Sequence, residues 1–470
     1  MRINTHCHVF TAKSVYTNGF KENFRNRARM TLESLGIPPS DGLLKRLMKI
    51  IDDLVNRAPG GDEGDTVLEQ REFLFRKLTG LLKPVFKALL GKVPFVDFLA
   101  IALLPDIDHV TDYLFLRDKA ASAGPEGKEV VLVPLMMDIL QTRGLLEEYQ
   151  YPGENGATLA LLQEQAKGTQ RQVLRYPGKV LPFYTVNPLR PDFAPLFEQA
   201  MDQGFVGLKV YPSLGYQFVE TRPGVREYRV TGAMLPTLSA CQRNGYPVMM
   251  HCNNAGFALT RVTAEWCEPL RYARALEKEL PELKWCYGHF GGGTFYRKYT
   301  KFWSIKRLKQ LLYPDNPHYL WCRNIQKQMR DMGGRVFADV SCHVEALKPE
   351  ESGAYFNALA SVLRDPALVG QMLWGTDYFL DQMSCDEYEF WVHFEEQLKA
   401  RDPELFRRMA HDNPARYLGL PDGDGTVGKN IENYARYIYK NRDHEAFNPK
   451  EMAAWLRNYY DAHKAEFPGI

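Results

Sequence analysis

Histidine, lysine and aspartate residues stand at chemically useful places in this sequence. His6 and His8 flank Cys7 close to the first residue, and in a β-strand such alternate residues share one face. Imidazole and carboxylate groups bind divalent metals and transfer protons. A fold that gathers such groups could therefore form a catalytic site. Four further polar residues lie within or end later apolar runs: Lys209, His251, His289 and Asp377.

Eight short apolar segments are predicted as strands that position these residues. They are nearly all apolar rather than alternating, which is typical of strands buried on both faces. Helix-like segments precede several of them, as at 193–203 and 232–244, so we predict parallel strands joined by helical crossovers. Eight such strands close a (β/α)8 TIM barrel of the α/β class. The segments are 2–9, 130–137, 180–186, 205–211, 247–251, 283–289, 335–341 and 371–377.

The chain is longer than such a barrel requires. A TIM barrel takes about 250 residues, whereas this chain has 470. We place the surplus in a large helical insertion after strand one (10–128), a further insertion at 292–334 and a helical tail (421–470). We interpret residues 1–470 as one decorated barrel domain. The first insertion is expected to cap the barrel mouth, and the aromatic-rich tail to pack or to contact another copy, so a homo-oligomer is left open.

Composition excludes several classes of protein. The hydrophobic content of 45% is ample for a packed core, which argues against a disordered chain. Lys and Arg (59) nearly balance Asp and Glu (57) with no basic cluster, so a nucleic-acid partner is not expected. Asp97 interrupts the most apolar stretch (95–104), no apolar signal segment follows Met1, and the eight cysteines form no CxxC pair. We expect a cytoplasmic protein with reduced thiols that spans no membrane.

The polar residues are in register with the predicted strand ends. In a TIM barrel the C-terminal ends of the strands converge on the catalytic face. A buried polar group there costs free energy unless it has a partner. Any one of these residues could be a core histidine or a capping aspartate, but the set of six is hard to explain as separate accidents.

One family carries the same ordered set of residues. His6-x-His8, Lys209, His251, His289 and Asp377 resemble the amidohydrolase superfamily of metal-dependent TIM-barrel enzymes. The segments GFVGLKVYPSLGY, PVMMHC, GHFGGG and LWGTDY are similar to its amidohydrolase-related branch. The segment NPARYLGL (413–420) resembles the helix that follows strand eight in that family. The resemblance runs from residue 1 to about 420, without the 10–128 insertion and without the tail.

The resemblance implies a site for one or two divalent metal ions, with Zn²⁺ as the first candidate. His6, His8 and Asp377 would bind the first ion. Lys209, after carboxylation by CO₂, would bridge to a second ion, and its Lys-Val-Tyr-Pro context resembles the carboxylated-lysine strand of dihydroorotases. Burial favours the neutral amine that carboxylation requires. Two other interpretations of Lys209 stay open, a contact with a substrate anion and a structural ion pair.

His251 and His289 would hold that second ion. With one ion only, His251 would join the first ligand set, and His289 would become an acid/base group or orient the substrate carbonyl. In both versions Asp377 would accept a proton from the attacking water and return it to the leaving group.

The resemblance implies a hydrolase that cleaves a C–N or C–O bond of a carbonyl-containing small molecule with metal-activated water. The alternative within the same branch is a one-metal, non-oxidative decarboxylase of an aromatic or unsaturated acid. A TatD-like nuclease shares some of the motifs, but Lys209 and the lack of a basic cluster disfavour it. A catalytically silent, metal-stabilised barrel that serves as a binding module is disfavoured by Asp377, since a structural site needs no proton acceptor.

Substrate contacts are predicted just past the strand ends. Arg190 could pair with a substrate carboxylate or form a salt bridge to a neighbouring loop. Tyr211 and His343 are the other two principal candidates for lining the pocket. Further candidates at the same level are Tyr216, Asn253, Asn254 and Tyr378.

Overall fold

The computed structural model describes most of the chain. The described ranges are 1–15, 40–56, 66–82, 93–121, 129–138, 154–190, 192–221, 228–253, 261–298, 317–378, 385–421 and 425–469, with the single residues 21, 25, 29, 38, 256 and 258.

Eight parallel strands close into a barrel, as predicted. Six of them form one sheet in the order β10-β9-β8-β7-β4-β3, and β1 pairs with β2. Single bridges complete the ring, because Leu132 pairs with Val180 between β2 and β3, and Cys7 pairs with Tyr378 beyond β10. Each strand lies within its predicted segment. The strands are β1 (Arg2–Cys7), β2 (Val130–Pro134), β3 (Phe183–Thr185), β4 (Gly207–Val210), β7 (Val248–His251), β8 (Trp285–Gly288), β9 (Val336–Asp339) and β10 (Met372–Leu373).

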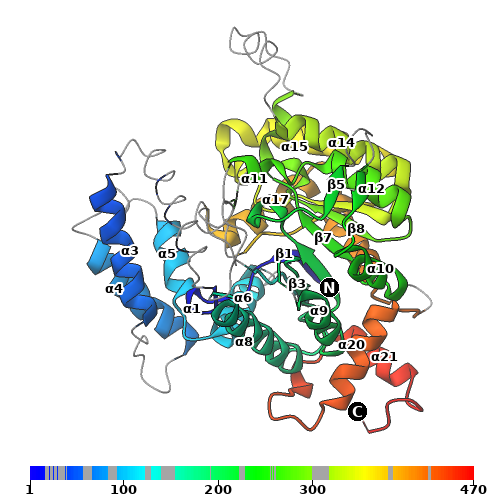
Figure 1. Ribbon diagram of the computed structural model, residues 1–470, viewed down its shortest axis with the longest axis horizontal. Coiled ribbons are helices and arrows are strands. Elements are labelled where there is room, and N and C mark those ends of the chain that lie inside the picture. Colours follow the sequence, from blue (N-terminus) through cyan, green and yellow to red (C-terminus); the bar gives the residue numbers. More distant parts are fainter. Residues whose placement is uncertain are drawn as a thin grey trace.

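Helices follow each strand and surround the barrel (Figure 1). Two of them change the predicted insertion boundaries. Helix α6 lies inside the 10–128 segment, yet it contacts β2 and lies between α8 and α17, so it is the first helix of the ring. Helix α14 is likewise the crossover between β8 and β9 rather than part of an added insertion. The ring helices are α6 (Ile107–Ala121), α8 (Glu154–Arg175), α9 (Phe193–Asp202), α10 (Leu235–Asn244), α12 (Pro269–Glu279), α14 (Pro317–Met332), α15 (Pro349–Leu363) and α17 (Glu387–Lys399).

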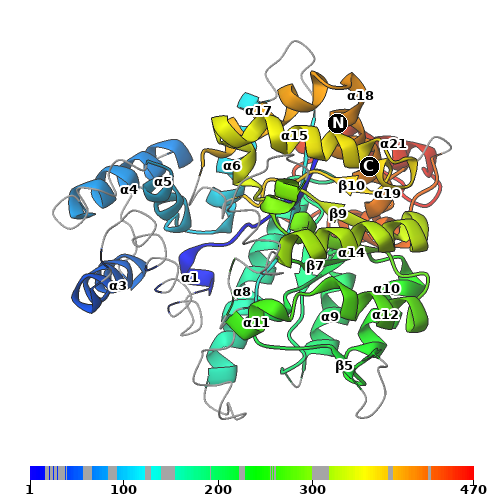
Figure 2. The same ribbon diagram turned by 90° about the horizontal axis from the view of Figure 1, so that it is seen from above.

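The described part of the insertion after β1 is helical, as predicted, and stands to one side of the barrel (Figures 1 and 2). It contains α1 (Ala12–Val15), α3 (Asp41–Asn56), α4 (Val67–Leu82) and α5 (Val93–Ala102). A capping box starts α4, because the Thr66 amide donates to Glu69 Oε2 over 2.7 Å and the Glu69 amide donates to Thr66 Oγ1 over 3.3 Å.

The C-terminal helices pack beneath the barrel on the side away from α3–α5 (Figures 1 and 2). Tyr434 of α20 donates to the Val180 carbonyl over 2.9 Å, and Trp455 of α21 donates to the Gly178 carbonyl over 2.9 Å. The tail aromatics therefore serve packing at the start of β3. The helices beyond the ring are α11 (Arg261–Glu265), α16 (Pro366–Val369), α18 (Pro403–Arg407), α19 (Asn413–Leu418), α20 (Lys429–Lys440) and α21 (Ala454–Ala462).

A short antiparallel hairpin of β5 (Val219–Thr221) and β6 (Tyr228–Val230) was not predicted, because three-residue strands carry little periodicity. All eight cysteines lie in the described residues and no disulfide joins any two of them. None of the described helices has both the length and the hydropathy required to cross a bilayer.

Candidate metal centre

The barrel brings all six predicted polar residues to one place at the C-terminal ends of its strands. His6 and His8 come from β1 and the residue just beyond it, Lys209 from β4 and His251 from β7. His289 and Asp377 follow the ends of β8 and β10. All six side chains are buried.

Asp377 is at the centre of the first group of contacts. Its Oδ1 atom lies 3.1 Å from Nε2 of His8 and 3.3 Å from Nε2 of His6. Oδ1 is nevertheless a buried oxygen that receives no hydrogen bond of acceptable geometry. One ligand atom from each of His6, His289 and Asp377 lies within 4.8 Å of the others.

The remaining predicted ligands adjoin this group. Nζ of Lys209 lies 3.3 Å from Nε2 of His6. Nε2 of His289 lies 3.0 Å from Nδ1 of His251, and the rings of His6 and His289 have centroids 4.7 Å apart. The six side chains therefore form one continuous cluster.

Two glycines allow the strands to come this close to His6. A Cβ atom at Gly375 would lie 2.6 Å from Cβ of His6, and one at Gly288 would lie 3.0 Å from Cε1 of the same ring. His289 and Asp377 themselves have left-handed backbones, with φ of 68° and 66°. Such conformations are costly for residues other than glycine and gather at functional sites.

The surroundings shift two of the imidazoles towards the neutral form and Asp377 towards the charged form. Burial lowers the pKa of His6 to about 3, with Lys209 adding to the effect, and burial also lowers the pKa of His289. Burial alone would raise the pKa of Asp377, but the three neighbouring imidazoles outweigh it and hold that pKa below its usual range. Neutral imidazole and ionised carboxylate are the forms that bind metals.

The amine of Lys209 is also shifted towards its neutral form. Burial lowers its pKa to about 8, against the opposing effect of Asp339 and Asp377. A neutral amine is the form that reacts with CO₂.

These residues fit a divalent cation. Zinc binds nitrogen and oxygen ligands at about 2.0–2.2 Å, so two ligand atoms of one ion lie about 3.0–3.5 Å apart. The contacts of Asp377 Oδ1 with His6 and His8, at 3.3 and 3.1 Å, are in that range. A cation would also satisfy the buried Oδ1 atom, which costs free energy when it is left without a partner.

Of the predicted substrate contacts, Arg190 is engaged within the protein. It is 2% exposed, and its Nε and Nη2 atoms donate to the two carboxylate oxygens of Asp138 over 2.6 and 2.8 Å. From the sequence alone, this salt bridge to a neighbouring loop is the alternative to a contact with a substrate carboxylate. Contact between Arg190 and a substrate remains a prediction.

Tyr211 and His343 both lie beside the predicted ligands. The Tyr211 ring stacks on the ring of His251, with centroids 4.0 Å apart. His343 is buried, and its Nε2 atom lies 2.8 Å from the carbonyl oxygen of His289. Tyr211 therefore borders the cluster, whereas His343 lies behind it.

The further candidates are spread around the barrel mouth. Tyr216 is buried, and its hydroxyl accepts a hydrogen bond from the Tyr211 amide over 2.5 Å. Tyr378 is buried beside β1, and Asn253 is partly exposed. Asn254 lies outside the described residues.

Two residues of the cluster were missed from the sequence. Asp339 at the end of β9 is fully buried, and its Oδ2 atom lies 2.9 Å from Nδ1 of His6. Ser341 Oγ lies 3.0 Å from the same nitrogen and 2.9 Å from Nδ1 of His289. A carboxylate inside an otherwise apolar strand was the signal that could have revealed them.

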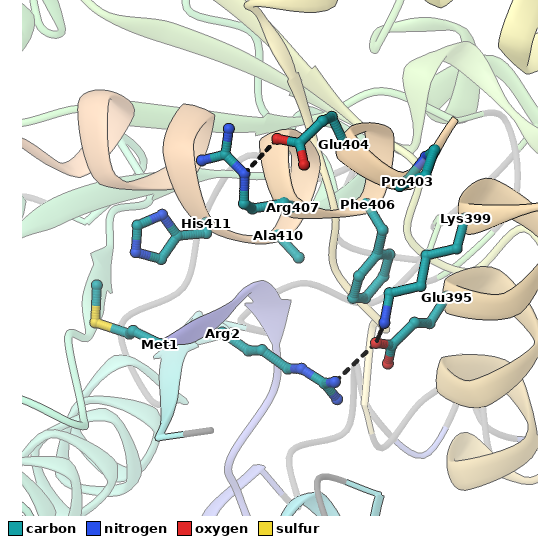
Figure 3. Close-up of a pocket in the computed structure, with 10 residues that line it drawn as sticks. All are labelled: Met1, Arg2, Glu395, Lys399, Pro403, Glu404, Phe406, Arg407, Ala410 and His411. Atoms are coloured by element: carbon teal, nitrogen blue, oxygen red, sulfur yellow. Dashed lines mark hydrogen bonds and ion pairs between the residues drawn. The ribbon is translucent and has the colours of Figure 1, made fainter. Parts of the chain in front are cut away.

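A cavity at the opposite end of β1 contains none of the predicted residues (Figure 3). It has a volume of about 320 Å³, and its charged side chains pair with one another, as Arg2 and Lys399 do with Glu395. The N-terminal face of a TIM barrel serves stability. The six predicted polar residues all lie at the other end of the strands.

Comparison with known proteins gives one family match. The family whose description is "Amidohydrolase" matches residues 169–420, more than half of the chain. No curated protein sequence matches the chain.

Solved structures resemble the chain at low identity. A probable 2-pyrone-4,6-dicarboxylic acid hydrolase from Acinetobacter baumannii has 12% identity and a TM-score of 0.40, over 62% of this chain and 84% of that one. A 2,6-dihydroxybenzoate decarboxylase from Rhizobium has 14% identity and a TM-score of 0.40, over 66% and 88%. A 5-carboxyvanillate decarboxylase from Sphingomonas paucimobilis has 12% identity and a TM-score of 0.41, over 79% and 95%.

The family match covers the strands from β3 to β10, which carry Lys209, His251, His289 and Asp377. The interpretation as a silent binding barrel is thereby set aside. The chain belongs to the amidohydrolase family of TIM-barrel enzymes, whose members act on small molecules.

Proposed function

We propose that this enzyme is a metal-dependent hydrolase that cleaves a C–N or C–O bond next to the carbonyl group of a small molecule. The observation that carries the proposal is the Oδ1 atom of Asp377, a buried carboxylate oxygen with two imidazole nitrogens within 3.3 Å and no hydrogen bond. Such an oxygen can be a metal ligand and also a proton acceptor.

His6, His8 and Asp377 would hold the first ion, and His251 and His289 a second. A divalent cation, with Zn²⁺ as the first candidate, supplies two effects when bound here: it lowers the pKa of water and it polarises the substrate carbonyl. Asp377 accepts the proton of the attacking water and then transfers it to the departing nitrogen or oxygen. Burial of the site excludes other water from the reaction.

Lys209 would join the two ligand groups after carboxylation. Its neutral amine adds to CO₂, so that an N–C bond forms and one proton leaves. The product is a carbamate, whose oxygens are metal ligands, whereas an ammonium group would repel a cation. Burial supports this step, because it lowers the pKa of the amine to about 8.

Substrate is expected to enter over Tyr211, with the 10–128 segment shaping the entrance. Deletion of the part of that segment before α6 should reduce activity on the native substrate, and full activity would refute this role. A cytoplasmic location and self-association also remain predictions.

Isotope labelling distinguishes hydrolysis from the decarboxylation that the sequence left open. The metal-loaded enzyme is offered a panel of lactones, esters, amides and aromatic acids in H₂¹⁸O, with Asp377→Asn as the control. Hydrolysis places ¹⁸O in the carboxylate of the product, and the control should not do so. Release of CO₂ from an aromatic acid, with deuterium entering the ring in D₂O, would overturn the hydrolase proposal in favour of decarboxylation.

A further inference from the structure

Three buried polar residues lie at the end of β9 and in the turn that follows it: Asp339, Ser341 and His343. None of them is a candidate ligand. All three make hydrogen bonds to His6 or His289. We refer to them as the β9 triplet.

Asp339 links the two histidines. Its Oδ2 atom lies 2.9 Å from Nδ1 of His6, and its Oδ1 atom accepts hydrogen bonds from the backbone amides of His289 and Ser341, each over 3.0 Å. The Oδ1 atom already accepts two hydrogen bonds, so Asp339 acts as an acceptor and His6 donates from Nδ1 to its Oδ2 atom.

Ser341 sets the same tautomer on His289. The Ser341 hydroxyl donates to Asp339. The Oγ atom of Ser341 therefore acts as the acceptor for Nδ1 of His6 at 3.0 Å and for Nδ1 of His289 at 2.9 Å. The Ser341 carbonyl also lies 3.2 Å from Nδ1 of His289. Both rings therefore carry their proton on Nδ1, and each directs the lone pair of Nε2 into the cluster.

His343 and Asp339 together hold the left-handed backbone of His289. The carbonyl oxygen of His289 accepts from Nε2 of His343 over 2.8 Å, while its amide donates to Asp339. Nδ1 of His343 lies 2.6 Å from the hydroxyl of Tyr355, which donates to it. Since φ is 68° at His289 and 46° at Phe290, these bonds stabilise a strained turn.

We propose that the β9 triplet positions the metal ligands: it fixes the Nε2 lone pairs of His6 and His289 towards the ion and holds His289 in the turn that places it there. The three residues are positioning residues and touch neither ion nor substrate. The inference rests on the proposed metal centre. Partners of this kind typically change metal affinity by roughly 10–100-fold when they are removed.

Asp339→Asn tests the tautomer directly. Asparagine keeps the shape and can still accept from the two amides, but its NH₂ group then faces Nδ1 of His6 and favours the wrong tautomer. We expect Co²⁺ binding to the full-length protein to weaken by roughly 10–100-fold, with a changed visible absorption spectrum of the bound Co²⁺. Asp365→Asn is the matched control, because Asp365 caps α16 away from the site. It should leave both the affinity and the spectrum unchanged.

A second pair of variants covers the case in which Asp339→Asn fails to fold. His343→Gln keeps a donor for the His289 carbonyl, whereas His343→Leu removes it. We expect the Co²⁺ spectrum and affinity to stay close to wild type in His343→Gln and to change in His343→Leu. Equal Co²⁺ affinity and spectra in wild type and all folded triplet variants would overturn the inference. A wild-type protein that binds no Co²⁺ would instead overturn the proposed metal centre.

Discussion

Nζ of Lys209 lies 3.3 Å from Nε2 of His6, and both side chains are fully buried. Burial lowers the pKa of both groups, and Lys209 adds to the effect on His6. A neutral amine beside the metal ligands is the arrangement that carboxylation requires.

We therefore predict that Lys209 takes up CO₂. Protein loaded with metal and ¹³C-labelled bicarbonate should give a carbamate carbon signal by NMR, and Lys209→Ala should abolish it. Lys284→Ala is the matched control, because burial also lowers the pKa of Lys284, at the other end of the barrel. A signal that survives in Lys209→Ala, or no signal in the wild type, would leave Lys209 as an uncarboxylated amine.

Asp377→Asn should strongly reduce turnover while the protein stays folded. Asparagine fits the same space but cannot accept the proton of the attacking water, so we expect kcat to fall by roughly 10²–10⁴-fold. The metal-free variant should keep the circular dichroism spectrum of the wild type, because asparagine has nearly the same size and shape as aspartate. Activity within a factor of ten of wild type would refute the proton-transfer role.

Arg190→Met should act mainly on stability. It leaves the carboxylate of Asp138 buried without its partner, and we expect the free energy of unfolding to fall by about 3–5 kcal/mol. The double variant Arg190→Met with Asp138→Leu removes both charges and should recover most of that loss. The check is chemical denaturation of all three proteins.

A different result would restore the predicted substrate contact. If the double variant is as stable as wild type but its KM for the substrate rises tenfold or more, Arg190 also binds substrate. If KM is unchanged, its role is structural.

The free energy of unfolding of the metal-free protein should begin to fall at a higher pH than titration of its carboxylates alone would cause. Burial lowers the pKa of His6 to about 3, and also lowers the pKa of His289, whereas unfolded histidine titrates near 6.5. Below pH 6.5 the unfolded state binds more protons, so the stability present above that pH is lost as the pH falls. We expect the free energy of unfolding to fall by up to roughly 1.4 kcal/mol per pH unit for each of these histidines.

Chemical denaturation of the protein, with its metal removed by a chelator, measures this pH dependence between about pH 6.5 and 5. Asp339 and Asp377 do not contribute there, because their pKa values are lowered and both carboxylates stay ionised in that range. His6→Asn should make the slope shallower. A stability that is constant or rises as the pH falls would contradict the neutral, buried state of these histidines.

The barrel and the six polar residues could be predicted because both signals are local. Strands buried on both faces give unbroken apolar runs, and a polar residue at the end of such a run, such as His251 or Asp377, is conspicuous. Asp339 has the same kind of signal, but its partner His6 is 333 positions away, so its role depends on the closed barrel. The pairing of Arg190 with Asp138 likewise depends on the packing of two loops.

Helix boundaries were the less predictable part. A helical sequence does not tell whether the helix belongs to the barrel or to an insertion, and only the contacts of α6 with α8 and α17 identify it as a barrel helix. The same holds for α14, which the sequence placed in an insertion.

The number of metal ions bound per chain decides whether the six polar residues form a metal centre. We would purify full-length protein without chelator, with bicarbonate present, and measure its metal content by elemental mass spectrometry. The double variant His6→Asn with His8→Asn is measured in the same way. His411→Asn is the control, because His411 lies at the far end of the barrel. We expect two divalent ions per chain in the wild type and the control, and a loss of bound metal in the double variant. Wild-type protein without stoichiometric metal, or a double variant that retains all of it, would refute the proposed metal centre.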